Sequence, residues 1–118
     1  MTTEEFKILM EAGIDAEKAI SRLMGNEKIY LKYLFRFAED QNYELLLRAF
    51  QRGDLSEAFR AVHTLKGTSS NVGVYSVSDI ADYLTEELRD GHPGKIEDDI
   101  LRLGNAFHIA QAAIRRIM

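Results

Sequence analysis

Residues 54–72 read DLSEAFRAVHTLKGTSSNV and decide the fold. Apolar and small residues recur in this stretch at every third or fourth position, which is the spacing of one face of an α-helix. These positions are Leu55, Ala58, Phe59, Val62, Leu65, Ser69 and Val72. Asp54 followed by Glu57 has the pattern of a capping box, and Gly53 can close a preceding helix. The stretch therefore predicts one long amphipathic helix over 55–72.

The residues before this helix predict two short helices and then a longer one. The short helices are expected within about 3–24, with Thr2 capping the first, Gly13 separating the two and Asp15 capping the second. Asn26 then caps a long amphipathic stretch, in which a bend is expected at 41–42.

The residues after this helix predict two more helices. Ser76 with Asp79 is expected to cap a helix through Leu88. The Gly-His-Pro-Gly run at 91–94 is a loop signal, and the last helix is expected over about 95–117. No stretch shows the two-residue alternation of a strand of useful length, so the sequence predicts an all-α protein.

The number and length of the helices point to one architecture. A chain of 118 residues has the size of a single domain, expected here over 1–118. Four long amphipathic helices with short connections predict an antiparallel up-down four-helix bundle over about 26–117. The short N-terminal helices would cap one end or one side of this bundle.

Composition excludes several classes of function. Fifteen basic and 19 acidic residues give a net charge of −4, which argues against a nucleic-acid-binding protein. The chain has no cysteine, which rules out a disulfide framework, a thiolate metal site and a cysteine nucleophile. No apolar run approaches the length of a membrane span, and the N-terminus lacks the pattern of a signal peptide. We therefore expect a cytoplasmic protein without a membrane partner.

The central helix contains residues that a purely structural helix would avoid. Gly67 and the small polar residues after it are poor helix formers. At 100° per residue, His63 lies about 120° from the centre of the apolar stripe, on the boundary or solvent side. Its neighbours are Lys66 and Gly67 one turn later, Ser70 a further turn along and Arg60 one turn before.

This grouping suits phosphoryl transfer. A neutral imidazole is a good nucleophile near pH 7. Lys66, with support from Arg60, can offset the negative charge of a phosphoryl group on His63. Gly67 leaves room for the active site of another protein to approach the imidazole. Because such transfer depends chiefly on in-line positioning and charge stabilisation, a rigid helix that presents one histidine can serve it.

At these residues the sequence resembles the histidine-containing phosphotransfer domains, or HPt domains, of multistep phosphorelays. The family motif is a His, any residue, Leu, Lys and Gly, followed by a run of small residues to a second Gly. It is matched by His63, Leu65, Lys66, Gly67 and Gly73, and the similarity extends over about residues 14–117. The resemblance implies a four-helix bundle in which His63 is phosphorylated and Lys66 and Gly67 supply the phosphate-facing charge and the access point.

The resemblance also implies a function and a set of partners. The protein would be a phosphocarrier in two-component signalling, accepting a phosphoryl group on His63 from a receiver-domain aspartate and passing it to another receiver. Its partners would be response-regulator receiver domains and a hybrid sensor histidine kinase. Mg²⁺ is expected on the receiver, so no cofactor is expected on this chain. The sequence lacks a P-loop, so no ATP-dependent kinase activity is expected, and a monomer suits a carrier that exposes one helix face.

Two positions allow more than one interpretation. Family members often place a Gln or Glu 22 residues after the histidine, where it can hydrogen-bond the imidazole, but this sequence has Thr85 there. The shorter threonine hydroxyl is a candidate for orienting the ring. Gly73 either allows close helix packing or ends the histidine helix as a C-cap.

The N-terminal apolar residues also have two interpretations. They either form part of a docking patch exposed near the histidine or close the end of the core. The residues concerned are Phe6, Ile8, Leu9, Met10 and Ile14.

A rival interpretation from another class is a helical interaction module that is not phosphorylated. Such a degenerate relative would bind a kinase or receiver without carrying phosphate. Thr85 favours this interpretation, and the intact set of His63, Lys66 and Gly67 opposes it. A metalloenzyme built on a bundle is disfavoured, because no histidine has an acidic residue three or four positions before it. His92 and His108 are expected to be surface or structural residues.

Overall fold

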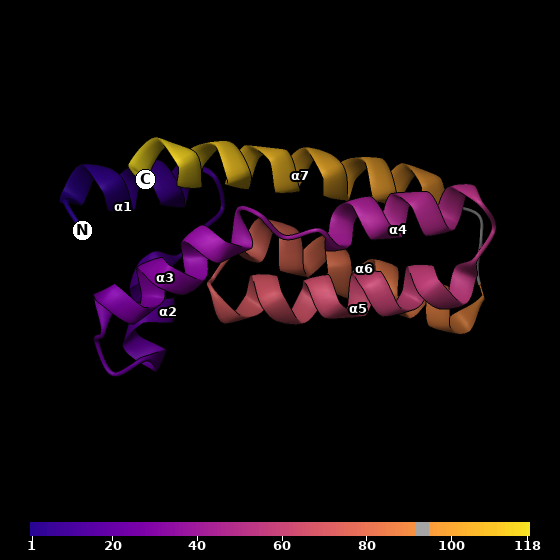
Figure 1. Ribbon diagram of the computed structural model, residues 1–118, viewed down its shortest axis with the longest axis horizontal. Helices are drawn as coiled ribbons and strands as arrows, with labels where there is room; N and C mark the ends of the chain where they lie inside the picture. The colour runs from indigo at the N-terminus through magenta and orange to yellow at the C-terminus, as the bar shows by residue number, and fades with distance from the viewer. Residues whose placement is uncertain (92–94) are drawn as a thin grey trace.

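The computed structural model describes residues 1–91 and 95–118, and all regular secondary structure in these ranges is helical (Figure 1). The all-α prediction is therefore confirmed. The helices are α1 (Thr3–Glu11), α2 (Ala16–Arg22), α3 (Glu27–Phe37), α4 (Asn42–Gln51), α5 (Leu55–Asn71), α6 (Tyr75–Asp90) and α7 (Ile96–Ile117). The loop predicted at 91–94 falls, apart from Gly91, outside the described residues, and His92 lies outside them too.

Capping side chains set the start of four of these helices. Each accepts a hydrogen bond from the backbone N–H three residues later, at 3.0–3.1 Å, which satisfies a donor that the helix itself leaves free. The four capping residues are Thr2, Asp15, Asn26 and Asp54. All four were expected from the sequence, because capping depends on neighbours along the chain.

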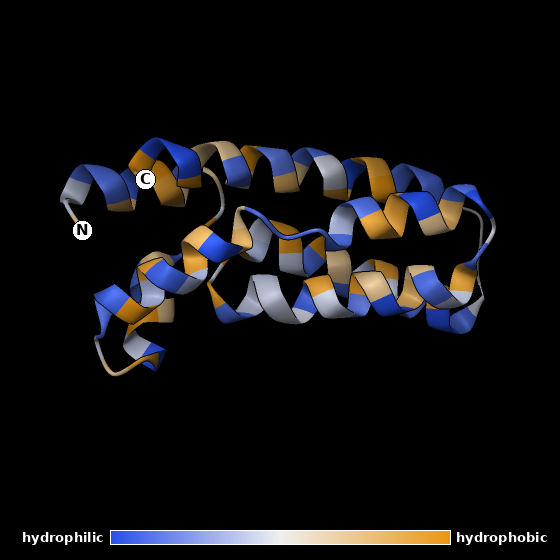
Figure 2. Ribbon diagram, in the orientation of Figure 1, coloured by the Kyte–Doolittle hydropathy of each residue, from blue (hydrophilic) through white to orange (hydrophobic). Residues whose placement is uncertain are grey.

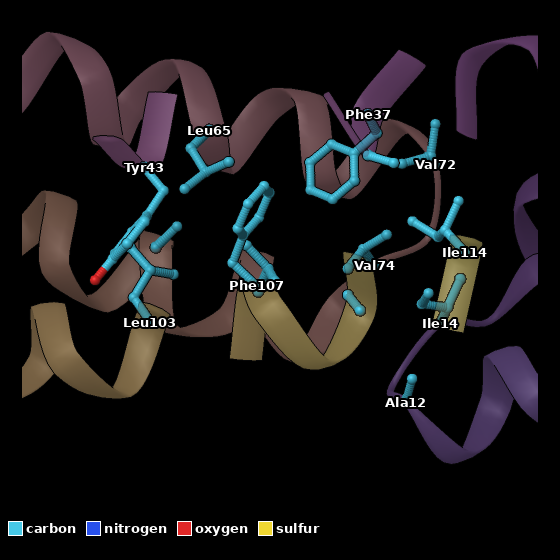
Figure 3. Close-up of a cluster of buried hydrophobic side chains, with 14 of the residues drawn as sticks. Ala12, Ile14, Phe37, Tyr43, Leu65, Val72, Val74, Leu103, Phe107 and Ile114 are labelled. Atoms are coloured by element: carbon cyan, nitrogen blue, oxygen red, sulfur yellow. The ribbon is translucent and has the colours of Figure 1, made fainter. Parts of the chain in front are cut away.

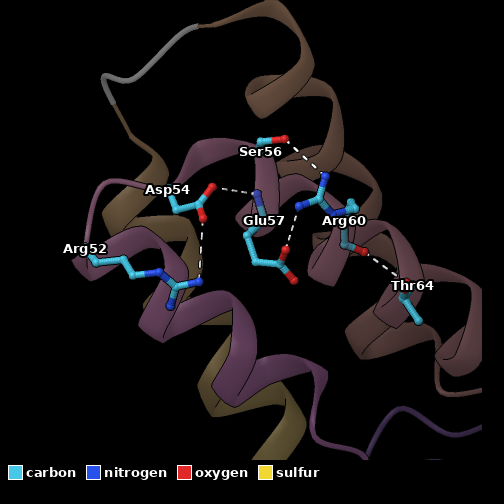
Figure 4. Close-up of polar contacts among 6 residues, drawn as sticks. All are labelled: Arg52, Asp54, Ser56, Glu57, Arg60 and Thr64. Atoms are coloured by element: carbon cyan, nitrogen blue, oxygen red, sulfur yellow. Dashed lines mark hydrogen bonds and ion pairs between the residues drawn. The ribbon is translucent and has the colours of Figure 1, made fainter.

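Two local predictions need correction. The box expected at Asp54 is incomplete, because the carboxylate of Glu57 pairs with Arg60 at 2.6 Å instead of returning to the backbone of Asp54 (Figure 4). The bend expected at 41–42 is a complete break, because α3 and α4 are separate helices. The Asp40 carboxylate accepts the backbone N–H of Asn42 at 2.7 Å and so helps to start α4.

The start of α6 also differs from the prediction, which gave Ser76 the role of a cap. The helix begins at Tyr75, and Val74 is its N-cap without a side-chain hydrogen bond. The Ser76 hydroxyl donates to the carbonyl of Ala12 at 3.1 Å, and the Ser76 N–H donates to the carbonyl of Gly13 at 3.2 Å. Ser76 therefore ties the N-terminal segment to the α5–α6 connection.

Gly73 serves both purposes considered from the sequence, because it ends the histidine helix and also allows close packing. It follows the C-cap of α5 with a φ of 75°, a conformation that glycine adopts at low cost. A Cβ at this position would lie 2.6 Å from the carbonyl oxygen of Asp15 and 3.2 Å from the Cβ of Ala19. The Gly73 carbonyl accepts the Asp15 N–H at 2.9 Å. The same residue thus turns the chain and lets α2 approach it closely.

The core lies between α5 and the helices that surround it. Helix α5 packs against α4 and α6, and α7 packs against α6, α4, α3 and α1 (Figure 1). Hydrophobic and hydrophilic residues alternate along the helices (Figure 2), and the buried hydrophobic residues of the described helices, α1 to α7, form one cluster. Phe107 lies among Phe37, Tyr43 and Leu65 in the cluster of Figure 3, with its ring 5.7 Å from that of Phe37 and 6.1 Å from that of Tyr43.

The N-terminal helices add to this core. Leu9 and Ile14 are fully buried, and Phe6 and Ile8 are partly buried against the same cluster. Met10 alone of the five apolar residues considered for docking is exposed, and α1 packs against α7 and α2. The structure therefore favours core closure over a docking patch for this segment.

The described residues offer neither a membrane-spanning helix nor a cluster of metal-ligating side chains. None of the helices in residues 1–91 and 95–118 combines the length and apolar character needed to cross a bilayer. Within the same residues no group of three or more His, Asp or Glu side chains is placed to hold a metal ion.

Candidate functional site

His63 projects from the exposed side of α5, as the helical count from the sequence predicted. Its imidazole lies against the ring of Phe59, one helical turn earlier. The two ring centroids are 5.9 Å apart and the ring planes differ by 4°, an offset-stacked arrangement. The imidazole is therefore open to solvent on its outer side and supported by an aromatic ring from its own helix.

Lys66 lies one turn after His63 and pairs with the neighbouring helix. Its ammonium nitrogen is 2.8 Å from Oδ1 of Asp82 on α6, and the two side chains are 39% and 57% exposed. An ion pair this exposed contributes about 0–1 kcal/mol, because water screens it. The lysine is thus held beside the histidine by a contact that another anion can displace.

Gly67 has no packing reason to be a glycine. Apart from its two chain neighbours and the adjacent backbone of α5, a Cβ built at this position meets no atom of the described residues within 4 Å, and the residue has ordinary helical geometry in the middle of α5. A glycine in a helix interior costs about 0.5–1 kcal/mol relative to alanine. The opening beside His63 is therefore maintained at a cost to stability that no contact in the structure explains.

Arg60 is directed toward the start of α5. Its guanidinium donates to the Glu57 carboxylate at 2.6 Å and to the Ser56 hydroxyl at 3.2 Å, as Figure 4 shows. Both partners precede Arg60 in the helix, whereas Lys66 and Gly67 follow it. The structure therefore does not bring Arg60 together with Lys66 around the imidazole.

The hydrogen bonds described for Ser70 involve its backbone, and those for Thr85 involve its side chain. The Ser70 carbonyl accepts a hydrogen bond from Arg22 at 3.1 Å. Thr85 is fully buried, and its hydroxyl donates to the carbonyl of Ala81 in its own helix at 2.6 Å. A buried hydroxyl that already donates is a poor candidate for orienting His63.

The register of α5 and α6 shows which residues face the histidine from the second helix. Lys66 meets Asp82, and the Phe59 ring lies 5.5 Å from the guanidinium carbon of Arg89, so the two helices run in opposite directions. His63 falls between these two contacts. Glu86 lies between Asp82 and Arg89 on the exposed side of α6 and pairs with Arg89 at 2.7 Å.

Sequence reasoning missed the contribution of Phe59 and α6. Phe59 was assigned to the core stripe, but it is only partly buried and its ring faces His63. The signal was present in the four-residue spacing, which places both rings on one side of the helix. The pairing of α6 with this site depends on helix register, which spacing within one helix does not specify.

A groove of about 420 Å³ lies beside the histidine helix, between α2, α3 and the end of α5. Its lining includes Arg22, Arg36, Phe37, Thr68 and Asn71. Thr68 lies about 140° around α5 from His63 at 100° per residue. The groove therefore opens on a different side of α5 from the imidazole and does not include it.

Comparison with known proteins gives one match. The model of the Hpt domain family matches residues 30–115, which is more than half of the chain. No curated protein and no solved structure matches. The matched range contains α4 to α7 and therefore the whole of the His63 site.

Proposed function

Because the chain belongs to the Hpt domain family, we propose that it is a histidine phosphocarrier of a two-component phosphorelay. In this proposal His63 accepts a phosphoryl group from an aspartate of one receiver domain and donates it to an aspartate of another. The upstream partner is a hybrid sensor histidine kinase and the downstream partner a response regulator. Residues 1–118 act as one monomeric carrier that contains no nucleotide site of its own.

The proposal rests chiefly on the exposed imidazole of His63 and on the open space that Gly67 leaves beside it. His63 is exposed, and the space at Gly67 is empty of described side chains. His108 is also exposed, but its ring meets Tyr43 and Phe107 edge-on, each with centroids 5.7 Å away, and no glycine lies one turn beyond it. Of the two histidines in the described ranges, His63 offers a partner's active site the better approach.

The proposed transfer needs only one nucleophilic atom from this chain. A lone pair of the neutral His63 imidazole, at Nε2 by analogy with the family, attacks the phosphorus of the aspartyl phosphate. An N–P bond forms in line with the breaking P–O bond, whose electrons leave with the aspartate carboxylate. Attack by the second receiver's aspartate reverses these bonds and restores the neutral imidazole. The metal ion that such transfer uses is supplied by the receiver.

Lys66 is proposed to stabilise the phosphorylated form. Lys66 follows His63 by about one helical turn, and its ammonium group is bound to Asp82 by an exposed, weak pair. A phosphoryl group on His63 is a stronger acceptor than a single carboxylate oxygen, because it offers more negative charge. The lysine can therefore turn from Asp82 to the phosphoryl group without a large loss of stability.

The architecture proposed for the carrier is an antiparallel four-helix bundle of α4 to α7. Contacts between α4 and α5, α5 and α6, α6 and α7, and α4 and α7 support a closed arrangement of four helices. The opposite directions of α5 and α6, derived from the contacts of Lys66 with Asp82 and of Phe59 with Arg89, support the antiparallel order.

The test is transfer from a phosphorylated receiver domain to the purified protein. The wild type, His63→Gln and His108→Gln are mixed with receivers that phosphorylate other phosphocarriers. The proposal expects acid-labile, base-stable label on the wild type and on His108→Gln, and none on His63→Gln. Label on His63→Gln equal to that on the wild type would assign the reaction to another residue. No label on any of the three would favour a module that binds without carrying phosphate.

A further inference from the structure

We propose that Phe59 is the positioning residue of His63, and that Arg89 in turn positions Phe59. The inference rests on the proposed function, because it concerns how the imidazole of a phosphocarrier is held for in-line attack. In this proposal the stacked Phe59 ring orients the imidazole, a role that a hydrogen bond to a ring nitrogen could otherwise fill.

The rings of Phe59 and His63 are nearly parallel. A difference of 4° between ring planes, with centroids 5.9 Å apart, is the offset geometry in which aromatic pairs attract each other. The last side-chain torsion of a histidine has a broad energy profile, so an unsupported imidazole would sample many orientations. Contact with Phe59 restricts this torsion and fixes the plane in which the ring nitrogens lie.

Phe59 is itself held from the second helix. The guanidinium carbon of Arg89 lies over its ring, 5.5 Å from the centroid, within the range of a cation–π contact. Arg89 is in turn bound to the Glu86 carboxylate at 2.7 Å. A continuous set of contacts therefore runs from α6 through Arg89 and Phe59 to His63.

The described residues provide no competing hydrogen bond to the imidazole. Thr85, the residue at the position from which such a bond was expected, is buried and donates to Ala81. Glu86, the next residue, pairs with Arg89. Stacking is the specific contact that remains in this part of the chain for setting the ring's orientation.

Orientation by stacking has a chemical consequence for a carrier. A hydrogen bond to one ring nitrogen fixes which nitrogen carries the proton. A stacked aromatic ring restrains the plane and leaves both nitrogens free to exchange protons with water or with a partner. His63 can then act as nucleophile toward one receiver and as leaving group toward the next without breaking a hydrogen bond to its own protein.

The test compares Phe59→Leu with Phe59→Tyr and uses Tyr83→Leu as the matched control. Tyr83 is an aromatic residue of α6, 56% exposed, that has no ring contact with His63. Two readouts are measured: the single-turnover rate of phosphoryl transfer at saturating receiver, and the mobility of the His63 ring by carbon-13 NMR relaxation in the unphosphorylated protein. Receiver affinity and melting temperature are recorded for each variant.

We expect Phe59→Leu to raise the mobility of the His63 ring and to lower the transfer rate about tenfold, because misplaced reacting atoms react more slowly. Receiver affinity should change by less than about twofold. Phe59→Tyr, which keeps the stacked ring, and Tyr83→Leu should behave as the wild type in both readouts. A Phe59→Leu protein with wild-type ring mobility and wild-type transfer rate would overturn the proposal.

Two further outcomes separate this inference from the proposed function. If Phe59→Leu unfolds, Arg89→Gln replaces it, since Arg89 is about half exposed and its loss leaves the core intact. Increased His63 mobility in Arg89→Gln supports the inference, and unchanged mobility overturns it. If the wild type accepts no phosphoryl group, the proposed function fails, while the NMR comparison still decides whether Phe59 fixes the ring.

Discussion

The ammonium of Lys66 lies 2.8 Å from the carboxylate of Asp82, so the cation next to His63 already has an anionic partner on α6. In the proposed carrier, a phosphoryl group on His63 would compete with Asp82 for this lysine and would also be repelled by the Asp82 carboxylate. Under that proposal, the Lys66–Asp82 contact influences how favourable the phosphorylated state is relative to the unphosphorylated one.

Asp82→Asn should shift phosphoryl groups toward His63. Removal of an exposed ion pair worth up to about 1 kcal/mol frees Lys66, and this corresponds to about a two- to fivefold change in the transfer equilibrium. The measurement is the partition of label between the receiver and this protein at equilibrium. Asp79→Asn, an exposed carboxylate one turn earlier in α6, is the control and should leave the partition unchanged.

Gly67→Ala should stabilise the fold and impair transfer. The added methyl group enters open space on a helical residue, so the free energy of unfolding should rise by about 0.5–1 kcal/mol. The same methyl group narrows the approach to His63 and should slow transfer from a receiver. Denaturant unfolding and transfer rates measure the two effects. A variant that is more stable and transfers at the wild-type rate would show that Gly67 does not serve access.

Gly104→Ala should destabilise the fold, in contrast to Gly67→Ala. Gly104 lies inside α7, and a Cβ at this position would collide with the phenol group of Tyr43. We expect a loss of about 1–3 kcal/mol in unfolding free energy, because the ring cannot move without disturbing its packing on Phe107. Thermal and denaturant unfolding measure this change. Gly104→Ala combined with Tyr43→Phe, which removes the hydroxyl nearest the new methyl group, should recover part of the loss.

The stability of the protein should fall between about pH 5 and pH 8 because of Glu87. Burial raises the pKa of Glu87 to about 7, and the neighbouring Asp99 carboxyl adds to the effect, against smaller opposing contributions from Lys95 and Arg102. The folded state therefore binds a proton that the unfolded state releases near its usual carboxyl pKa. Stability from this group is present at low pH and is lost as the pH rises through 7.

Glu87→Gln should remove this pH dependence. The amide keeps the shape of the protonated carboxyl and cannot ionise, so the variant should be more stable than the wild type by about 1 kcal/mol at pH 8, allowing for screening by water. At pH 5 the two proteins should be similar. Melting temperatures measured across this range test the sign. A wild-type protein that becomes more stable from pH 5 to pH 8 relative to Glu87→Gln would contradict the assignment.

Features that depend on neighbouring residues could be predicted from the sequence. The caps at Asp15 and Asn26 formed as expected, because each needs only a backbone N–H three residues away. The exposure of His63 followed from its angle to the apolar stripe of α5. The family assignment followed from a motif that lies within α5 and the two residues that follow it.

Features that depend on contacts between distant segments could not be predicted. Ser76 was wrongly predicted to be a helix cap. The acceptor of its hydroxyl group is the Ala12 carbonyl, 64 residues away in the chain, and a local sequence pattern cannot show such a contact. The pairing of Lys66 with Asp82 and the burial of Thr85 both depend on the register and rotation of α6 against α5. Phe59 lies at the edge of the apolar stripe, where the pattern alone does not separate a core residue from one that supports a site.

The central claim is that His63 carries the phosphoryl group, and the most direct measurement is the mass of the protein after incubation with a phosphorylated receiver, kept at neutral to basic pH. The account predicts a gain of one phosphoryl group on the wild type, located on His63 by fragmentation and lost after brief acid treatment. His63→Gln should show no gain. A phosphoryl group located on any other residue, or an unmodified wild type beside a receiver that phosphorylates another carrier, would contradict the claim.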